Sequence, residues 1–316
     1  MNPYLSPMII RKGTDSDLKE VISLLKVSLG EDRIPKTEAL WNWKHRQNPF
    51  GESPILLAES AGKIIGVRAF LKWEYSREGK IISAQRAVDT AVHPDFQGKG
   101  IFSQLTRKLL EKSRLEGTDL IFNTPNQKST PGYLKLGWEK WDRLPIKIKP
   151  VLFKADSQLS TPTSTWEEVA QLVGQLEQRQ KDHLELKTHL VPGYLNWRYR
   201  DCPIVDYRVV SDLESYLMIY RTKDSNWGKE LRICDLFTLD NPDLNSLSAQ
   251  LKKVERAEKP RFVTISGLSS TKELPRIWRY LPSLPVGPQV TLKQLNPQVQ
   301  PLNMPWSWSL GDLEVF

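Results

Sequence analysis

The chain has 316 residues, of which 39% are hydrophobic and 26% are charged, and its formal net charge is +8. This composition excludes a largely disordered chain, and the length predicts two cores of roughly 150 residues each. No stretch approaches the roughly 18 apolar residues of a membrane span, and residues 1–13 lack the apolar core of a signal peptide, so we expect a cytoplasmic protein.

The positive charge suits an anionic partner such as a cofactor phosphate, a nucleotide sugar or a nucleic acid. No run of five consecutive Lys or Arg residues occurs, and the basic residues are dispersed, so we expect no nucleic-acid groove. Cys202 and Cys234 lie far apart, without a CxxC motif or a His cluster. We therefore expect two buried thiols, no disulfide framework and no metal site.

The first half alternates between helical and extended patterns. Residues 8–12 predict a short strand, and residues 14–17 supply N-cap candidates for a helix whose apolar residues recur at helical spacing as far as Leu25. A second predicted helix, over residues 37–46, ends at the breaker Asn48-Pro49-Phe50-Gly51. Three β-rich runs over residues 55–59, 64–75 and 81–92 then predict an antiparallel meander.

After this meander the pattern changes to a turn at residues 93–95, a glycine-containing loop and a helix from Ile101. A strand over residues 119–123, a short helix over 130–136 and a final strand region over 138–148 follow. Residues 155–165 are rich in Ser, Thr and Gln. We therefore predict domains over residues 1–155 and 166–316, joined by a linker over 156–165.

The second half repeats parts of the first. Leu40–Pro49 aligns with Tyr194–Pro203, Arg86–Asp89 is echoed by Arg232–Asp235, and the pair Pro94-Asp95 is echoed by Pro242-Asp243. Three echoes in the same order predict a duplicated fold. We expect several Trp residues to pack in the core or between the domains rather than to stack on a sugar: Trp41, Trp43, Trp197, Trp306 and Trp308.

The loop Gln97–Ser103 has the composition of a phosphate-binding turn. Gly98 and Gly100 remove side chains, Lys99 adds positive charge, and the helix from Ile101 supplies unpaired N–H groups. Taken alone, the loop also fits an ordinary turn from a strand to a helix.

Two segments together resemble the GNAT acetyltransferase superfamily. Thr90–Ile101 resembles its acetyl-CoA-binding motif, Q/R-x-x-G-x-G/A after an apolar strand, with Phe102 as a departure because the family has a small residue there. Asn126–Trp138 resembles the later element in which an Asn precedes a Tyr and a helix ends in Leu-Gly-aromatic. The resemblance implies two GNAT-like α/β domains in tandem, each with a mostly antiparallel mixed sheet flanked by helices.

The resemblance further implies an N-acyltransferase that moves an acetyl group from acetyl-CoA to a small-molecule primary amine, with an amino-sugar derivative as the first candidate. The protein would act as a monomer or homodimer. Acetyl-CoA would be held by residues of the two motifs: Thr90, Ala91, Val92, Gln97, Gly98, Lys99, Gly100, Ile101, Phe102, Ser103 and Asn126.

The resemblance implies direct attack of the amine on the thioester. Backbone N–H groups near Ala91 would polarise the carbonyl, and Tyr133 would protonate the departing thiolate, although a Tyr here can also simply pack the short helix. Asp89 is the candidate base, and its echo at Asp235 fits a structural role equally well. Some relatives place a Glu five residues before the motif Asn, where this chain has Ile121.

The second half has no glycine loop at the corresponding place, because residues 240–246 read Asp-Asn-Pro-Asp-Leu-Asn-Ser. We therefore predict a degenerate second copy that binds no CoA and walls the acceptor site. The alternative function is a regulatory or scaffold protein that binds acyl-CoA without turning it over.

Overall fold

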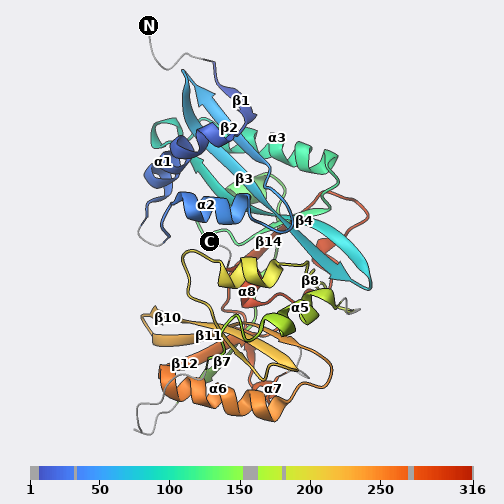
Figure 1. Ribbon diagram of the computed structural model, residues 1–316. Coiled ribbons are helices and arrows are strands. Elements are labelled where there is room, and N and C mark those ends of the chain that lie inside the picture. The colour runs from blue at the N-terminus through green and yellow to red at the C-terminus, as the bar shows by residue number, and fades with distance from the viewer. Residues whose placement is uncertain (1–6, 32–33, 152–162, 180–182, 270–273, 315–316) are drawn as a thin grey trace.

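The computed structural model describes residues 7–31, 34–151, 163–179, 183–269 and 274–314. The strands form two mixed sheets flanked by helices, one above the other in Figure 1. This arrangement confirms the predicted mixed α/β class. Most of the predicted linker, residues 156–162, lies outside the described residues, and the division of the chain at that linker stays a prediction.

The first sheet contains the predicted meander. Its strands follow the order β1 (Ile9–Lys12), β2 (Ile55–Ser60), β3 (Lys63–Arg77), β4 (Lys80–Val92), β5 (Leu120–Asn123), β14 (Gln289–Gln294) and β6 (Glu139–Arg143), and β8 (Lys187–Thr188) also pairs with β3. The strands β3 and β4 form a long antiparallel hairpin, whereas β4 and β5 run parallel.

Helices cover both faces of this sheet: α1 (Leu18–Leu29), α2 (Glu38–His45), α3 (Ile101–Leu115) and α4 (Thr130–Lys135). Gly66 of β3 lies under α3, where a side chain would meet Ile101 and Leu105. Its neighbour Val67 clusters instead with apolar residues of α1. Because successive strand residues point to opposite faces, α1 and α3 pack on opposite sides of the sheet.

The second sheet follows the order β13 (Ser283–Leu284), β7 (Ile146–Pro150), β12 (Phe262–Ser266), β11 (Gly228–Thr238), β10 (Tyr216–Ser225) and β9 (Arg208–Ser211). Again a long antiparallel hairpin, β10–β11, is followed by a parallel neighbour, β12. The remaining α-helices in the described residues are α5 (Ala170–Gln178), α6 (Leu244–Glu258), α7 (Arg276–Arg279) and α8 (Leu310–Leu313).

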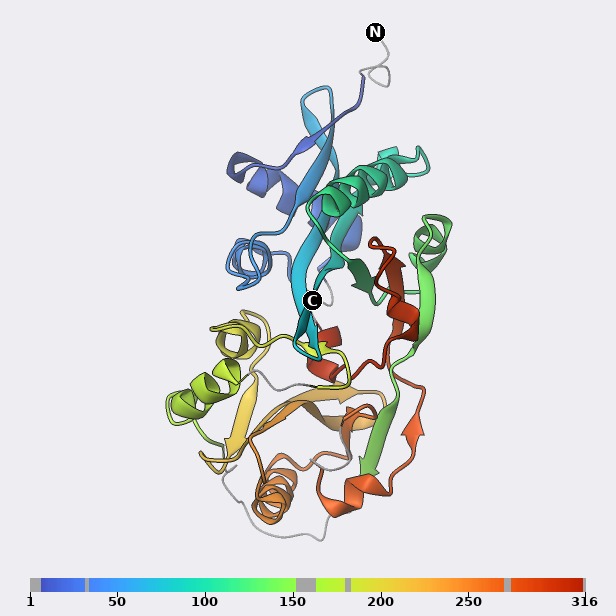
Figure 2. The ribbon, with the colours of Figure 1, turned by 90° about the vertical axis from the view of Figure 1, so that its right-hand side faces the viewer.

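The two sheets exchange strands, which the sequence did not predict. The single strand region expected over residues 138–148 is two strands, β6 and β7, interrupted at Leu144 and Pro145 and placed in different sheets. In return, β14 inserts between β5 and β6 of the first sheet. Figure 2 shows the green segment descending to the lower sheet beside the red segment that rises to the upper one.

One apolar core continues through the junction between the sheets. It includes four of the five predicted core Trp residues, and the fifth, Trp41, is buried against α1. The aligned segments of the two halves meet here, because Trp43 Nε1 donates to the carbonyl oxygen of Trp197 at 2.6 Å and Trp197 Nε1 donates to that of Trp43 at 2.7 Å. The expected core packing of these Trp residues is confirmed.

Cys202 and Cys234 are buried and unpaired, as expected. None of the helices in the described part of the chain is long and apolar enough to cross a membrane.

Candidate active site

The glycine loop connects β4 to α3 through two left-handed residues. Gly98 has a φ of 75° and Gly100 a φ of 77°, values that residues with side chains rarely adopt. A Cβ at Gly98 would meet nothing within 4 Å, so the glycine is required by its conformation and not by crowding. The Gln97 side chain fixes the loop by donating from Nε2 to the Val92 carbonyl oxygen at 3.1 Å.

The N-terminus of α3 is open. Gly100 is its N-cap residue and makes no side-chain cap, and the first turn carries no acidic residue. The leading N–H groups of a helix have no partner within the helix, and the helix dipole places positive charge at the same end. This end of α3 is therefore suited to bind a phosphate.

A cavity of about 420 Å³ lies between this loop, the end of β4 and α4. It brings together predicted residues from both motifs: Thr90, Ala91, Val92, Gln97, Gly98, Gly100, Ile101, Phe102 and Tyr133. Lys99, Ser103, Asn126 and Asp89 do not line it. The Lys99 ammonium lies 4.7 Å from the centre of the Phe96 ring, at the edge of the loop.

The strand β4 is bulged beside this cavity. Its parallel pairing with β5 ends at Arg86, and its pairing with β3 shifts register so that Asp89 and Thr90 together oppose Arg68. Asp89 takes a left-handed φ of 43° to make the bulge. Such bulges re-aim backbone groups, and this one lies where the resemblance places the thioester.

Tyr133 is 5% exposed and faces the cavity from α4. Its ring meets Phe102 and Trp138 edge-on, with centroids 5.6 and 5.2 Å apart. Phe102, the departure from the family motif, turns away from the loop and packs against Gly132, where an added Cβ would lie 3.2 Å from the Phe102 ring. The bulky side chain thus becomes a wall of the cavity and leaves the loop amides open.

Residues 9–141 match the family profile described as "Acetyltransferase (GNAT) domain". This part of the chain belongs to the GNAT acetyltransferase family. No protein of curated function matches the sequence.

Solved structures share the fold over nearly the whole chain. A GCN5-related N-acetyltransferase from Anabaena variabilis has 16% identity and a TM-score of 0.65, over 92% of this chain and 73% of its own. A conserved protein from Enterococcus faecalis, a probable N-acyltransferase, has 12% identity and a TM-score of 0.67, over 93% of this chain and 74% of its own. Eis1 from Mycobacterium abscessus has 13% identity and a TM-score of 0.60, over 92% of this chain and 74% of its own. At these identities the likeness shows the fold.

In the GNAT domain, the Asp89 carboxylate is held by two side chains of α2. Lys44 forms an ion pair with it, and His45 Nε2 lies 2.9 Å from its Oδ2. Burial alone would raise the pKa of Asp89, but the Lys44 charge and the His45 hydrogen bond outweigh burial and hold this pKa below its usual range. Its predicted role as base stays a prediction, and these contacts support the structural alternative, because a carboxylate kept ionised is a weak proton acceptor.

Asn126 organises the turn before α4. Its Oδ1 accepts from the Ser129 amide at 2.9 Å and its carbonyl oxygen accepts from the Thr130 amide at 3.0 Å. The structure therefore gives this residue a local role in placing Tyr133, and a contact with CoA stays a prediction.

Several residues of the cavity were not predicted from the sequence. Ser28 and Leu29 reach it from α1, which is distant in sequence, and the others lie inside the two motif segments: Phe96, Lys128, Ser129 and Gly132. Arg68 lies beneath the cavity. A single charge inside the apolar run Ile64–Leu71 was the signal that could have pointed to it.

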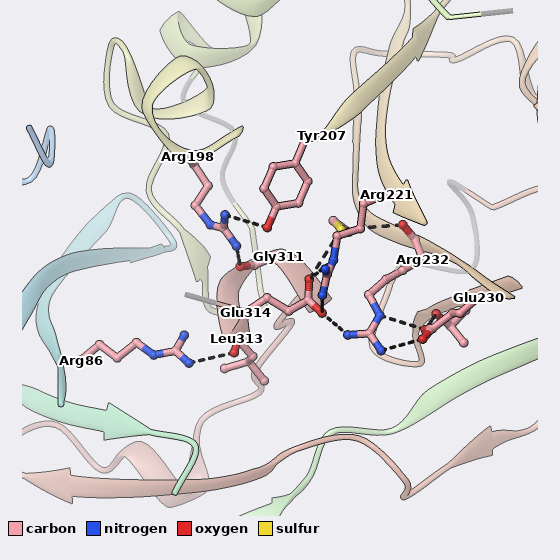
Figure 3. Close-up of polar contacts among 11 residues, drawn as sticks. Arg86, Arg198, Tyr207, Arg221, Glu230, Arg232, Gly311, Leu313 and Glu314 are labelled. Atoms are coloured by element: carbon pink, nitrogen blue, oxygen red, sulfur yellow. Dashed lines mark hydrogen bonds and ion pairs between the residues drawn. The ribbon is translucent and has the colours of Figure 1, made fainter. Parts of the chain in front are cut away.

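The site strand is anchored to the second sheet by the chain's last described residues (Figure 3). Arg86 of β4 donates to the carbonyl oxygens of Asp312 and Leu313 at 2.6 and 2.8 Å, and Arg198 donates to that of Gly311 at 2.5 Å. Glu314 forms ion pairs with Arg221 and Arg232 of the second sheet. The bulged strand of the GNAT domain is therefore held in part by residues of the second half.

Proposed function

We propose that the GNAT domain transfers an acetyl group from acetyl-CoA to a primary amine by direct attack. One observation carries the proposal: the open N-terminus of α3 and the hydroxyl-bearing Tyr133 face the same cavity. The helix N-terminus can bind an anionic phosphate, and the Tyr133 hydroxyl can donate a proton. Acyl transfer from acetyl-CoA needs both functions.

The cavity residues suit acetyl-CoA. The loop amides from Gly98 to Phe102 would hold its pyrophosphate, with Lys99 and Lys128 contributing positive charge. The backbone of Thr90, Ala91 and Val92 would hold the pantetheine arm, because β4 has lost its β5 partner beyond Arg86. When bound, acetyl-CoA supplies the thioester as the acyl donor.

The chemistry assigned to the protein is the movement of protons. The amine lone pair forms the new C–N bond, the C–S bond breaks with its electrons on sulfur, and the Tyr133 O–H bond breaks to give a thiol. The nitrogen loses a proton to water or, through water, to Asp89, and an equivalent proton returns to Tyr133. Backbone N–H groups at the bulge stabilise the intermediate oxyanion.

An amino-sugar derivative is our first candidate for the acceptor. Two of the similar structures are described as N-acetyltransferases or probable N-acyltransferases, which supports an amine. The second half would wall the acceptor site without binding CoA, so each chain would bind one CoA.

The proposal is tested by measuring thiol release from acetyl-CoA over a panel of amines, with amino sugars included. Tyr133→Phe is expected to lower kcat by about 100-fold or more and to leave the Kd for CoA nearly unchanged. Tyr207→Phe is the matched control, because Tyr207 is also buried beside an arginine but lies in the second half.

Full turnover by Tyr133→Phe would contradict the acid role. Thermal stabilisation by CoA without thiol release from any amine would instead support the non-catalytic acyl-CoA-binding protein.

A further inference from the structure

Arg68 of β3 is a fully buried cation without a carboxylate partner. Its exposed fraction is 0%, and no ion pair to it occurs among the described residues. Its guanidinium carbon instead lies 4.8, 5.4 and 5.1 Å from the ring centres of Phe70, Phe102 and Tyr133. Aromatic rings hold a cation without neutralising it, whereas a carboxylate would cancel its charge.

One nitrogen of Arg68 contacts two of the hydroxyl groups that line the cavity, those of Thr90 and Tyr133. Nη1 donates to the Tyr133 hydroxyl oxygen at 2.8 Å and also to Thr90 Oγ1. Nε and Nη2 are buried and have no hydrogen-bond partner in the described part of the chain. Among the described residues, Arg68 is therefore directed at these two hydroxyls and at no other polar group.

This contact determines which way the Tyr133 proton can point. A guanidinium can only donate, so the Tyr133 oxygen accepts from Arg68 and cannot give its own proton to it. Within the described residues, Tyr133 makes no second side-chain hydrogen bond. The phenolic proton is left for a group inside the cavity, and the nearby positive charge stabilises the negative charge that remains on the oxygen when the proton leaves.

We propose that Arg68 is a positioning residue for acyl transfer, which orients the Tyr133 and Thr90 hydroxyls so that the Tyr133 proton is delivered to the departing sulfur. This inference rests on the proposed function. It assigns Arg68 an effect on kcat that passes through Tyr133 and has little effect on the affinity for CoA.

The second half supplies a matched arginine. Arg198 is also fully buried, lies 4.8 and 5.4 Å from the ring centres of Tyr199 and Tyr207, and donates to the Tyr207 hydroxyl at 3.2 Å. It lines no part of the cavity. Arg198→Met therefore reports what the loss of a buried arginine among aromatic rings does to folding and, through its hydrogen bond to the Gly311 carbonyl oxygen, to the segment that anchors β4.

The test is a double-mutant cycle of Arg68→Met and Tyr133→Phe, with Arg68→Lys and Arg198→Met measured beside it. Thermal unfolding shows which variants fold, calorimetry gives the Kd for CoA, and thiol release gives kcat. Arg68→Met is expected to lower kcat about 10-fold or more with a Kd within about 3-fold of the wild type, and Arg68→Lys to restore part of the rate. In the Tyr133→Phe background, Arg68→Met is expected to lower kcat by less than about 2-fold.

If the fold-losses in kcat of the two single variants multiply in the double variant, the proposal is wrong. An unchanged kcat in Arg68→Met, or an equal loss of kcat in Arg198→Met, would also overturn it. If Arg68→Met does not fold, Arg68→Lys in the two Tyr133 backgrounds gives the same comparison. No thiol release by the wild type would overturn the proposed function itself, so the two failures are distinguishable.

Discussion

Helices α3 and α6 have the same length of 15 residues and the same place after the long hairpin of their sheets, but their N-termini differ. The carboxylate of Asp243 caps α6 and accepts from the amides of Asn245 and Ser246 at 3.0 and 2.9 Å. Gly100, which begins α3, offers no side chain. The Asp243 carboxylate thus occupies the N-terminus of α6, whereas the N-terminus of α3 is open, and this difference favours phosphate binding at α3.

The two central strands show a second contrast at their echoed aspartates. Asp89 has an ion pair with Lys44, whereas Asp235 accepts from the Tyr199 hydroxyl and has no ion pair among the described residues. Burial and the neighbouring Asp312 raise the pKa of Asp235 well above its usual range. The two aspartates at matching positions therefore differ: Asp89 is an ionised carboxylate in an ion pair, whereas Asp235 is a buried carboxyl group without one among the described residues.

The largest effect is expected at this pair of aspartates. Asp89→Asn removes the buried carboxylate of the ion pair with Lys44 and should lower the free energy of unfolding by about 3 kcal/mol. Asp235→Asn removes a group whose charge is disfavoured, and should cost less than about 1 kcal/mol. Denaturant titration of both variants tests the contrast. Equal losses would show that the Lys44 ion pair does not distinguish the two sites.

The next effect is the transfer of the α6 cap to α3. Gly100→Asp should weaken CoA binding about 100-fold, because a carboxylate at the helix N-terminus repels the pyrophosphate. Gly100→Asn is the control, since Asn has the same size, tolerates the left-handed conformation and carries no charge. Calorimetry with CoA compares the two. Wild-type affinity in Gly100→Asp would exclude α3 as the phosphate site.

A smaller effect depends on pH. Burial lowers the pKa of His45 from its ordinary 6.5, against the opposing hydrogen bond to Asp89. As pH falls through 6.5, the unfolded chain binds a proton at His45 that the folded chain does not, so stability is lost toward low pH. The slope from this ring is at most about 1.4 kcal/mol per pH unit.

His45→Gln should remove that contribution, so its free energy of unfolding should fall less steeply than that of the wild type between pH 7 and 5. Denaturant titrations at several pH values measure both slopes. Parallel slopes would mean that His45 does not titrate differently in the folded and unfolded states.

The smallest effect is at the cap of α6. Asp243→Ala removes both hydrogen bonds to the first turn and should lower the free energy of unfolding by about 1 kcal/mol. CoA binding and turnover should not change. A second CoA site in this variant would show that the closed N-terminus alone prevents binding in the second half.

The open helix end was predictable from the sequence because its determinants are local. Gly98, Gly100 and the apolar helix after them adjoin one another in the chain, and Tyr133 lies in a motif of the same family. The burial of Trp43 and Trp197 was also predictable from their size and spacing, although their reciprocal hydrogen bonds were not.

The remainder depends on contacts between distant residues. No local pattern in β14 indicates that it inserts between β5 and β6, which lie about 170 and about 150 residues earlier in the chain, because strand periodicity specifies a face and not a partner. In the sequence, Arg68 is a single charged residue within an apolar strand. Only the folded structure shows that aromatic rings, those of Phe70, Phe102 and Tyr133, surround it in place of a counter-ion. The anchoring of Arg86 by residues 312 and 313 likewise joins residues that lie 226 and 227 positions apart in the chain.

Calorimetric titration of the full chain with CoA tests the central claim most directly. The open N-terminus of α3 and the capped N-terminus of α6 predict one site per chain, occupied by CoA and competed by acetyl-CoA. Two sites per chain would contradict the difference between the halves, and the absence of binding would contradict the assignment of the α3 loop to CoA.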